Sequence, residues 1–302
     1  MKSPLVTVVV LSYNRPHYLG DALQSVAAQT YSQLEVLVVD NPSPQSEAIR
    51  EIVEQHPEMI LVQPDRNLGF AAGMNEGIRR ATGDYIYLTE DDIVLDPECV
   101  AAFVAHAATG TGRSLATGLM LNYGDRSIRC AGGEVSLAPI MRLTVFGQGE
   151  RDLRKYDRPF EVNFIPGAMV FADRETWNAL KGFREDFFMY FEDTELCLRA
   201  LKQGYKILVV PTAQALHFEP NEPVRDYVDF HKLKNIFKLY LLHAHRGVWP
   251  AFFLRYAVVD LLKAAIGNHS RFWLLLRALW TVGSNVPRLL RERSMSVSRA
   301  NS

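Results

Sequence analysis

The sequence predicts an α/β fold followed by a helical C-terminal region. Strand-like apolar runs alternate with helical patterns through about the first hundred residues, and an acidic cluster follows one of these runs. The last seventy or so residues are helical in pattern throughout. The chain has 302 residues, of which 48% are apolar and 22% charged, as expected for a globular protein of one large or two smaller domains.

The first part of the chain contains the clearest alternation. Strands are expected at residues 6–11, 35–39, 59–62 and 85–89, and helices at residues 18–29, 45–55 and 67–78. Strands separated by helices form βαβ units, so we expect a parallel sheet here. The last of these helices is rich in glycine and alanine, which let its backbone approach a neighbour or a ligand closely.

Periodicity is weaker in the second part of the chain. Eight glycines interrupt residues 109–157, where we expect loops and short strands. Regular structure returns at residues 162–171. A helix is expected at residues 194–203, opened by Glu192 and Asp193 and closed by Gly204. The next strand, residues 205–210, is expected to stop at Pro211.

The elements divide the chain into a domain of residues 1–224, with halves 1–108 and 109–224, and a helical region of residues 225–302. The helical region carries 13 Lys and Arg against 4 Asp and Glu, whereas residues 1–224 carry 20 against 30. Basic helices of low net hydrophobicity are typical of an anionic membrane surface. Packing on the rest of the protein, with the basic residues solvated, explains the pattern equally well, and a homo-oligomer is a further possibility. The acidic body and the lack of a recognisable module argue against nucleic-acid binding.

The sequence favours a cytoplasmic protein, peripheral on the inner face of the plasma membrane if the helices bind lipid. The three cysteines are far apart and form neither a zinc-binding nor a redox pattern. The N-terminal residues lead into a strand and do not resemble a secretory signal. Charged residues interrupt the apolar stretches 248–267 and 272–283, so we expect no membrane span.

Three acids, Glu90, Asp91 and Asp92, follow the expected strand at residues 85–89. Open α/β sheets bind ligands at the carboxyl ends of their strands. Adjacent carboxylates repel each other unless water or a cation neutralises them, so a divalent metal carrying a diphosphate fits this cluster. Taken alone, three adjacent acids are more simply explained as a solvated acidic turn.

Four blocks of sequence extend this reading. They are residues 8–15 (VVVLSYNR), residues 38–41 (VVDN) with the segment from Asn67 to Asp84, the acidic triplet, and residues 187–199 (FFMYFEDTELCLR) with Pro211 and His217 downstream. In this order they resemble the inverting family 2 glycosyltransferases, particularly the bacterial rhamnosyltransferase-like branch, over about residues 5–220. The resemblance implies the GT-A fold, a Rossmann-like mixed sheet flanked by helices, here with a helical C-terminal extension.

The resemblance also implies roles for individual residues. Asp92 and His217 would bind Mn²⁺ or Mg²⁺, Asp40 the N3–H of a pyrimidine base, and Asp91 a ribose hydroxyl. Asp193 would act as general base, assisted by Glu192. The implied nucleotide-sugar-binding residues are Ser12, Tyr13, Arg15, Asp40, Asn67, Gly69, Gly73, Asp91, Gly167 and Ala168. Glu90 departs from the common form of the motif and has no assigned role.

On the residues alone, several of these positions have simpler explanations. Asp40 precedes Asn41 and Pro42 and would suit a turn. Glu192 and Asp193 would suit a helix cap, and a lone histidine such as His217 is usually structural. These alternatives stay open until the positions of the side chains are known.

The function implied is that of a metal-dependent inverting glycosyltransferase. Its donor would be a UDP- or dTDP-sugar, with dTDP-rhamnose as one candidate, and its acceptor a glycan or lipid-linked sugar of a bacterial surface polysaccharide. The alternatives are a sugar nucleotidyltransferase and a non-catalytic nucleotide-sugar-binding protein. A sugar nucleotidyltransferase needs a glycine-rich phosphate loop, and residues 12–16 do not form one.

Overall fold

The computed structural model describes residues 3–110, 112–218, 225–267 and 269–300. They form two compact units. The larger consists of Met1–Glu134, Val145–Phe188 and Glu192–Pro220, and the smaller of Val135–Thr144, Met189–Phe191 and Asn221–Ser302, in each case as far as these segments are described. The expected domain boundary after residue 224 adjoins residues 219–224, which lie outside the described residues, so that boundary stays a prediction.

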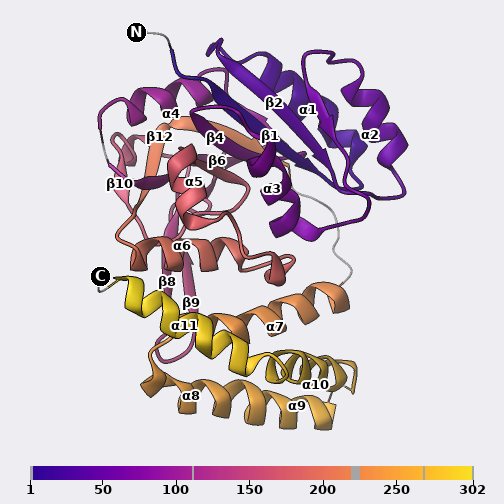
Figure 1. The fold of residues 1–302 in the computed structure, drawn as a ribbon, viewed down its shortest axis with the longest axis vertical. Helices are drawn as coiled ribbons and strands as arrows, with labels where there is room; N and C mark the ends of the chain where they lie inside the picture. The colour runs from indigo at the N-terminus through magenta and orange to yellow at the C-terminus, as the bar shows by residue number, and fades with distance from the viewer. Residues whose placement is uncertain (1–2, 111, 219–224, 268, 301–302) are drawn as a thin grey trace. The chain divides into compact units, whose positions relative to one another are not determined.

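A mixed sheet forms the centre of the larger unit (Figure 1). Its strands lie in the order β10-β12-β6-β11-β4-β1-β2-β3, while β5 pairs with β12 and β7 with β6. These strands are β1 (Val6–Ser12), β2 (Leu34–Asp40), β3 (Ile60–Val62), β4 (Tyr85–Glu90), β5 (Ile93–Leu95), β6 (Ser114–Asn122), β7 (Ile128–Cys130), β10 (Phe160–Glu161), β11 (Met169–Asp173) and β12 (Lys206–His217). A separate two-stranded sheet joins β8 (Gly133–Ser136) and β9 (Arg142–Val145).

The predicted βαβ units are confirmed in the first part of the sheet. Strand β1 pairs in parallel with β2 and with β4, and β2 pairs in parallel with β3. Strand β11 then runs antiparallel to β4, so the sheet as a whole is mixed. This is the arrangement that the resemblance to GT-A enzymes implies.

Helices cover both faces of the sheet, and the strands are apolar on both sides. Val8 and Val10 of β1 belong to the same core as helices α1, α2 and α4, whereas Val9 and Leu11 belong to the core of α3, α5 and α6. Alternate residues of a strand point to opposite faces, which explains the uninterrupted apolar run. The helices are α1 (Pro16–Ala27), α2 (Ser46–Val53), α3 (Gly69–Arg80), α4 (Cys99–Ala107), α5 (Arg174–Leu180) and α6 (Glu192–Lys202), with short 3₁₀ turns at Leu153–Lys155 and Glu185–Phe187.

Two expectations about strands were wrong. Strand β12 does not stop at Pro211 but continues to His217, because its pairing with β6 shifts register between Val209 and Gln214 and so accommodates the proline. The glycine-rich segment 109–157 also contains β6, a long strand in the middle of the sheet. A Cβ at Gly118 of β6 would collide with the carbonyl oxygen of Ala213, so this glycine permits close strand packing.

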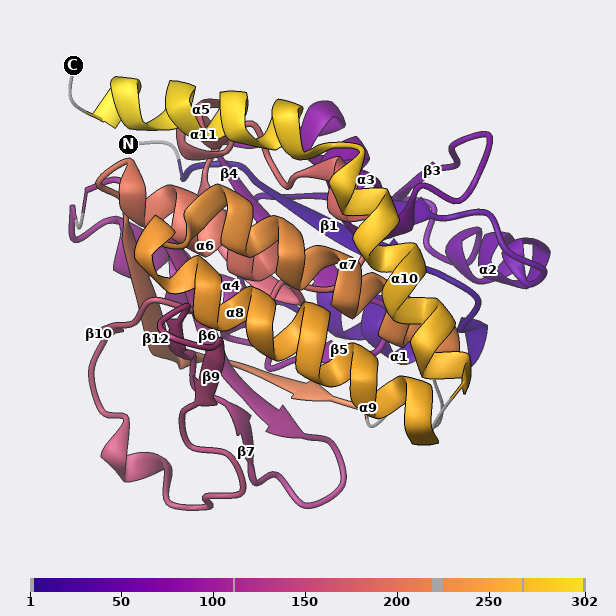
Figure 2. The same cartoon turned by 90° about the horizontal axis from the view of Figure 1, so that it is seen from below.

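The smaller unit consists mainly of C-terminal helices, which confirms the predicted helical extension; Figure 2 shows them from below. They are α7 (Arg225–His243), α8 (Trp249–Phe253), the π-helical segment Leu254–Val259, α9 (Asp260–Gly267), α10 (His269–Gly283) and α11 (Val286–Ala300), with a 3₁₀ turn at Arg246–Val248. Among the described residues, no helix is long and apolar enough to cross a membrane.

The C-terminal helices have a core of their own. The ring of Phe252 is fully buried and stacks on Tyr240 of α7 at 3.6 Å between centroids. Arg293 of α11 donates hydrogen bonds to the carbonyl oxygens of Leu241 and Ala244, at 3.1 and 2.7 Å. The guanidinium group of Arg293 thus supplies hydrogen bonds at the end of α7, where carbonyl groups have no partner within the helix.

Candidate functional site

The carboxyl ends of three parallel strands bring polar residues to one edge of the sheet. Ser12 at the end of β1 pairs in register with Asp40 at the end of β2. On the other side of β1, Leu11 pairs with Glu90 at the end of β4. The acidic triplet and Asp40, which are far apart in the sequence, therefore lie at the same edge, where such sheets bind ligands.

Asp91 is held by the loop that follows β1. Its Oδ2 accepts hydrogen bonds from Ser12 Oγ at 2.8 Å and from the backbone N–H of Tyr13 at 3.0 Å. Burial and the adjacent charge of Asp92 raise the pKa of Asp91 to about 7. The Tyr13 ring is 47% exposed, so it lies open to a ligand beside this carboxyl group.

Asp92 lies between two cationic or polar side chains. Its Oδ2 is 2.5 Å from Arg15 Nη1 and 3.4 Å from His217 Nε2. Burial disfavours its charged form, but the hydrogen bond and charge of His217 and the charge of Arg15 outweigh burial and lower the pKa of Asp92. The structure thus brings Asp92 and His217 together, as their predicted role requires.

The position of His217 follows from the continuation of β12 past Pro211. His217 is the last residue of this strand and pairs with Ile93 of β5, next to Asp92. The backbone N–H of Phe218 donates to the Asp92 carbonyl oxygen at 3.0 Å. The His217 Nδ1 lies 3.2 Å from the sulfur of Met120, which orients the ring with Nε2 toward the carboxylate. The sequence did not indicate Met120 as part of the site.

Asp40 is fully buried at the end of β2. Its Oδ2 accepts a hydrogen bond from Gln63 Nε2 at 3.0 Å, whereas its Oδ1, equally buried, has no hydrogen-bond partner among the described residues. Burial raises the pKa of Asp40. A buried acceptor without a partner is costly, so this oxygen is suited to a hydrogen-bond donor on a ligand.

The loop before α3 is fixed by asparagine side chains. Asn41 donates to the Gly69 carbonyl oxygen at 3.0 Å and accepts from the Leu68 N–H at 3.2 Å. Asn67 Oδ1 accepts from the Gly69 N–H at 2.8 Å. Asn41 was not among the predicted site residues, although a polar residue directly after a buried strand could have indicated it.

Two glycines of α3 have packing roles. Gly69 has a φ of +77°, and a Cβ there would lie 2.6 Å from Phe188. A Cβ at Gly73 would lie 2.7 Å from Leu11 and 2.9 Å from the Asn41 amide. Close packing thus explains both glycines, and their predicted contact with the donor stays a prediction.

Asp193 lies in the first turn of α6, and its carboxylate points to the turn before β11. Its Oδ2 accepts from the Gly167 N–H at 3.3 Å, and its Oδ1 accepts from the Thr194 N–H at 2.6 Å. Burial raises the pKa of Asp193 despite these hydrogen bonds. A carboxylate with a raised pKa is a stronger base than an ordinary aspartate and is suited to proton abstraction.

Asp193 and the acidic triplet share the same region of the larger unit. Gly167 and Ala168 directly precede Met169, which pairs in register with Thr89. Burial and the neighbouring acids raise the pKa of Glu90 to about 8, and the negative charge of Asp193 contributes to this increase. A Cβ at Gly167 would lie 3.0 Å from Phe70, so a side chain there would crowd the turn that holds Asp193.

The backbone before Asp193 is strained. Phe188, Tyr190 and Phe191 have φ values of +68°, +66° and +67°, in the left-handed region that bulky residues avoid. Within the smaller unit, Asn235 of α7 donates hydrogen bonds to the carbonyl oxygens of Met189 and Tyr190, at 2.9 and 2.7 Å. Strain of this kind persists where the surroundings impose it, often beside active sites.

The two glutamates near Asp193 differ in their surroundings. Glu192 is buried, with 6% of its surface exposed, directly before Asp193. Glu195 forms an ion pair with Arg199 at 2.9 Å, and Arg199 also donates to the carbonyl oxygen of Gly182 at 2.8 Å. Glu195 therefore has a structural role, whereas the assistance of Glu192 in catalysis stays a prediction.

The donor atoms at Asp92 fit a divalent cation. Asp92 Oδ1 is buried and has no hydrogen-bond partner in the described part of the chain, and His217 Nε2 faces the same carboxylate. No group of three or more His, Cys, Asp or Glu side chains that could hold a metal occurs among the described residues. Two protein ligands are enough where diphosphate oxygens and water complete the coordination shell, as is common for Mg²⁺.

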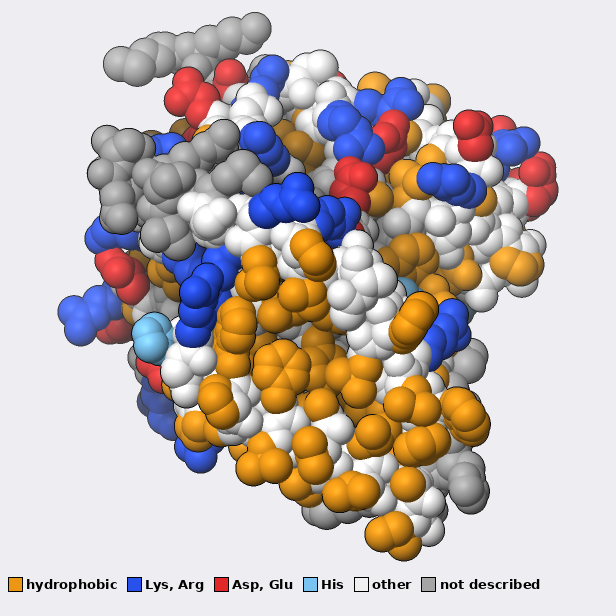
Figure 3. Space-filling model, turned by 60° about the horizontal axis from the view of Figure 1, so that its bottom comes forward, with side chains coloured by type: hydrophobic (Ala, Val, Ile, Leu, Met, Phe, Trp, Pro, Cys, Tyr) orange, Lys and Arg blue, Asp and Glu red, His pale blue; other side chains and the backbone are white. Residues whose placement is uncertain are grey.

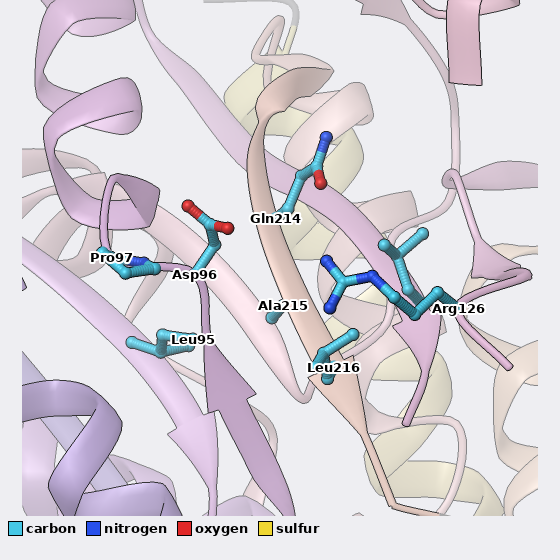
Figure 4. A pocket seen from close by; sticks show the side chains of 8 residues that line it. Leu95, Asp96, Pro97, Arg126, Gln214, Ala215 and Leu216 are labelled. Atoms are coloured by element: carbon cyan, nitrogen blue, oxygen red, sulfur yellow. The ribbon is translucent and has the colours of Figure 1, made fainter. Parts of the chain in front are cut away.

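Two pockets of the larger unit lie away from this site. One of about 130 Å³ lies at the end of β5, between Asp96, Arg126 and Gln214 (Figure 4). A groove of about 530 Å³ follows α4 at His106 and Thr109. Neither is lined by any predicted site residue, and the first is smaller than the roughly 300 Å³ typical of ligand sites.

Comparison with known proteins identifies the family. A family model described as glycosyltransferase like family 2 matches residues 3–231. The chain belongs to this family. Among curated relatives, the N-acetylglucosaminyl-diphospho-decaprenol L-rhamnosyltransferase of Mycobacterium tuberculosis (strain CDC 1551 / Oshkosh) is 25% identical over 272 residues, which are 82% of this chain and 87% of that protein. The O-antigen biosynthesis protein RfbC of Myxococcus xanthus is 28% identical over 232 residues, 72% of this chain but 17% of that protein.

Solved structures agree on the fold. GalNAc-T7 with UDP, GalNAc and Mn²⁺ superposes with a TM-score of 0.70 at 16% identity, covering 95% of this chain and 58% of that chain. The mannosyltransferase PcManGT of Pyrobaculum calidifontis, in complex with GDP-Man and Mn²⁺, gives 0.56 at 19% identity, covering 100% of this chain and 87% of that chain. This family 2 glycosyltransferase therefore has the GT-A fold, as predicted.

Proposed function

We propose that this enzyme is a metal-dependent, inverting glycosyltransferase of bacterial surface polysaccharide synthesis. Its donor is a UDP- or dTDP-sugar, with dTDP-rhamnose the favoured candidate, and its acceptor is a glycan or a lipid-linked sugar. The observation that carries the proposal is the contact of the buried Asp92 with the partly exposed His217 at the strand edge. Asp40 lies at the same edge, and Asp193, whose pKa is raised, lies in the same region.

Asp40 is suited to recognition of a pyrimidine base. The buried Oδ1 that has no partner among the described residues would accept the N3–H of the base, while Gln63 holds the other oxygen. Uracil and thymine both present this N3–H, so Asp40 accommodates either nucleotide. Asp91, fixed by Ser12 and Tyr13, follows β4 at the same edge of the sheet and would accept a hydrogen bond from a ribose hydroxyl.

The diphosphate would bind at Asp92. Asp92 and His217 would hold Mn²⁺ or Mg²⁺, which when bound neutralises the charge that develops on the leaving diphosphate. Arg15, whose guanidinium contacts Asp92, adds a second positive charge at this end of the site. Both superposed structures were solved with Mn²⁺, which supports a divalent cation here.

Asp193 would take the proton of the acceptor hydroxyl as its oxygen attacks the anomeric carbon. The bond from the anomeric carbon to the diphosphate breaks on the opposite face, so the configuration inverts. Two backbone N–H groups, from Gly167 and Thr194, fix the carboxylate in place. A positioned base of this kind typically accelerates a reaction by about 10² to 10⁴.

The choice of sugar and acceptor rests on the relative from Mycobacterium tuberculosis. Its name specifies an L-rhamnosyl group and an N-acetylglucosaminyl-diphospho-decaprenol acceptor, and the match covers most of both chains. This supports a lipid-linked acceptor and a rhamnosyl donor for the present enzyme.

A donor screen tests the proposal. Purified enzyme is incubated with UDP-, dTDP- and GDP-sugars, with and without Mn²⁺, and released nucleotide is measured with and without an N-acetylglucosaminyl diphospholipid. We expect release from one donor, dependent on metal and increased by the acceptor. Release from a purine-based donor alone would contradict the role of Asp40, and full turnover in excess chelator would contradict the metal site.

A further inference from the structure

The smaller unit exposes large apolar side chains on neighbouring helical segments. Six of them lie between residues 254 and 280, and five of these are more exposed than any described large apolar residue of the larger unit. Their exposed fractions are 59% for Leu254, 45% for Val258, 59% for Leu262, 90% for Ile266, 66% for Trp273 and 80% for Trp280. We call these six residues the apolar stripe.

The spacing places the stripe along the outer sides of its helices. Leu254, Val258, Leu262 and Ile266 recur every four residues from the π-helical segment through α9, so they lie on one face. The two tryptophans of α10 are seven residues apart, which is two helical turns. Helices α9 and α10 contact each other, and Figure 3 shows hydrophobic side chains gathered over a broad area with Lys and Arg at its edges.

These helices are apolar on two sides. Their inner residues, such as Ala264, Leu275 and Ala278, are buried in the core of the smaller unit. A helix on the surface of a globular protein normally presents a polar face to water. Here much of the outer face is aliphatic and aromatic, and contiguous exposed apolar surface of this kind marks an interaction site.

The composition of the stripe and the charge around it identify the partner. Tryptophan is enriched where protein meets the interface of a bilayer, and an apolar helix face with basic neighbours is typical of helices that lie in that interface. Arg271 and Arg277 are exposed on the same helix as the two tryptophans. Residues 225–302 carry 13 basic against 4 acidic residues.

We propose that the apolar stripe is the surface by which this enzyme docks on an anionic lipid bilayer, without crossing it. An anionic surface attracts the basic region, whereas a second copy would bring two regions of like charge together. The inference deepens the proposed function, because docking would place the enzyme at the surface that contains a lipid-linked acceptor. The apolar and basic residues that would bind the bilayer are the same whichever nucleotide-sugar is the donor.

Vesicle sedimentation tests the proposal. The intact protein is mixed at low salt with vesicles of phosphatidylcholine, with or without phosphatidylglycerol. We expect binding to the vesicles that contain phosphatidylglycerol and release at high salt. The double variant Ile266→Asp with Trp280→Asp should lower the partition coefficient at least about tenfold, because two apolar anchors become charges repelled by the surface. Ile60→Asp, at a 51% exposed residue of the larger unit, is the matched control and should bind like the wild type.

A second measurement does not depend on the double variant folding. Brominated phosphatidylcholine, mixed into the same anionic vesicles, should quench the tryptophan fluorescence of the wild type, and the conservative Trp280→Phe should reduce that quenching. Absence of wild-type binding at low salt would overturn the proposal. Unchanged vesicle binding by a folded double variant would also overturn it. If the wild type is a dimer and the double variant becomes a monomer that still binds lipid, the stripe is a dimer interface and the proposal is wrong. Nucleotide release with a water-soluble acceptor should be unchanged in the double variant, which separates this test from a failure of the proposed reaction.

Discussion

Replacement of Asp193 by asparagine tests the assignment of the general base. The substitution keeps the shape of the side chain and removes its ability to take a proton. We expect kcat to fall by about 10² to 10⁴, the usual contribution of a positioned base. Because Asp193 does not contact Asp40 or Asp92, the affinity for nucleotide and Mn²⁺ should change less than about threefold.

The structure also predicts the effect on stability. The asparagine of the variant could keep the hydrogen bond from Thr194, but its amide group would then face the N–H of Gly167, so one hydrogen bond is lost. Such a loss costs about 1 kcal/mol, which a folded domain tolerates. Burial of the wild-type carboxylate opposes its charged form, and removing that charge offsets part of the cost.

The assay measures steady-state sugar transfer, calorimetric nucleotide binding and urea unfolding on the same preparations. Asp186→Asn is the matched control, because it neutralises a nearby carboxylate whose ion pair with Arg184 at 3.1 Å is partly exposed. Its kcat should remain close to that of the wild type. Turnover by a folded Asp193→Asn enzyme within tenfold of the wild type would refute the assignment.

Three further predictions follow from named contacts. Burial raises the pKa of Asp193, and the base must be ionised to act, so kcat/KM should fall with decreasing pH at a midpoint above the ordinary aspartate pKa of about 4. A pH-rate profile that stays flat down to about pH 4 would contradict this. His217→Ala should weaken Mn²⁺-dependent donor binding about tenfold or more without affecting metal-free nucleotide binding; calorimetry with and without Mn²⁺ measures both, and equal affinities would remove His217 from the metal site. Gly73→Ala should lower the free energy of unfolding, measured in urea, by about 1 to 3 kcal/mol, because the new Cβ would collide with Leu11 and Asn41. Gly20→Ala is the control: no atom lies within 4 Å of its new Cβ, so it should be neutral or stabilising.

Much of the larger unit could be predicted from local patterns. The parallel strands β1, β2 and β4 are short apolar runs separated by amphipathic helices. This pattern predicts both that the runs are strands and that helices connect them. Strand β6 was missed because its glycine and its burial on both faces remove the alternation that marks a strand. The end of β12 was misplaced because proline normally ends a strand, and only the pairing with β6 shows that the register shifts around it.

The site shows the same division. Asp40, Asp91 and Asp92 could be predicted because each follows a buried strand, and the resemblance supplied their roles. The supporting residues Gln63 and Met120 could not, because they act through contacts with residues distant in the sequence. Glu90 remains without a role, although burial and nearby carboxylates raise its pKa to about 8.

The sequence by itself determined the alternation of strands and helices, the positions of the acids and the basic character of the C-terminal region. These are local properties, which side-chain chemistry and spacing express directly. Only the tertiary structure decided that His217 meets Asp92, that Gly167 holds Asp193, and that aliphatic and aromatic residues of α9 and α10 face outward. Strand pairing and helix packing join segments far apart in the chain, and an apolar residue carries no local sign of whether it is buried or exposed.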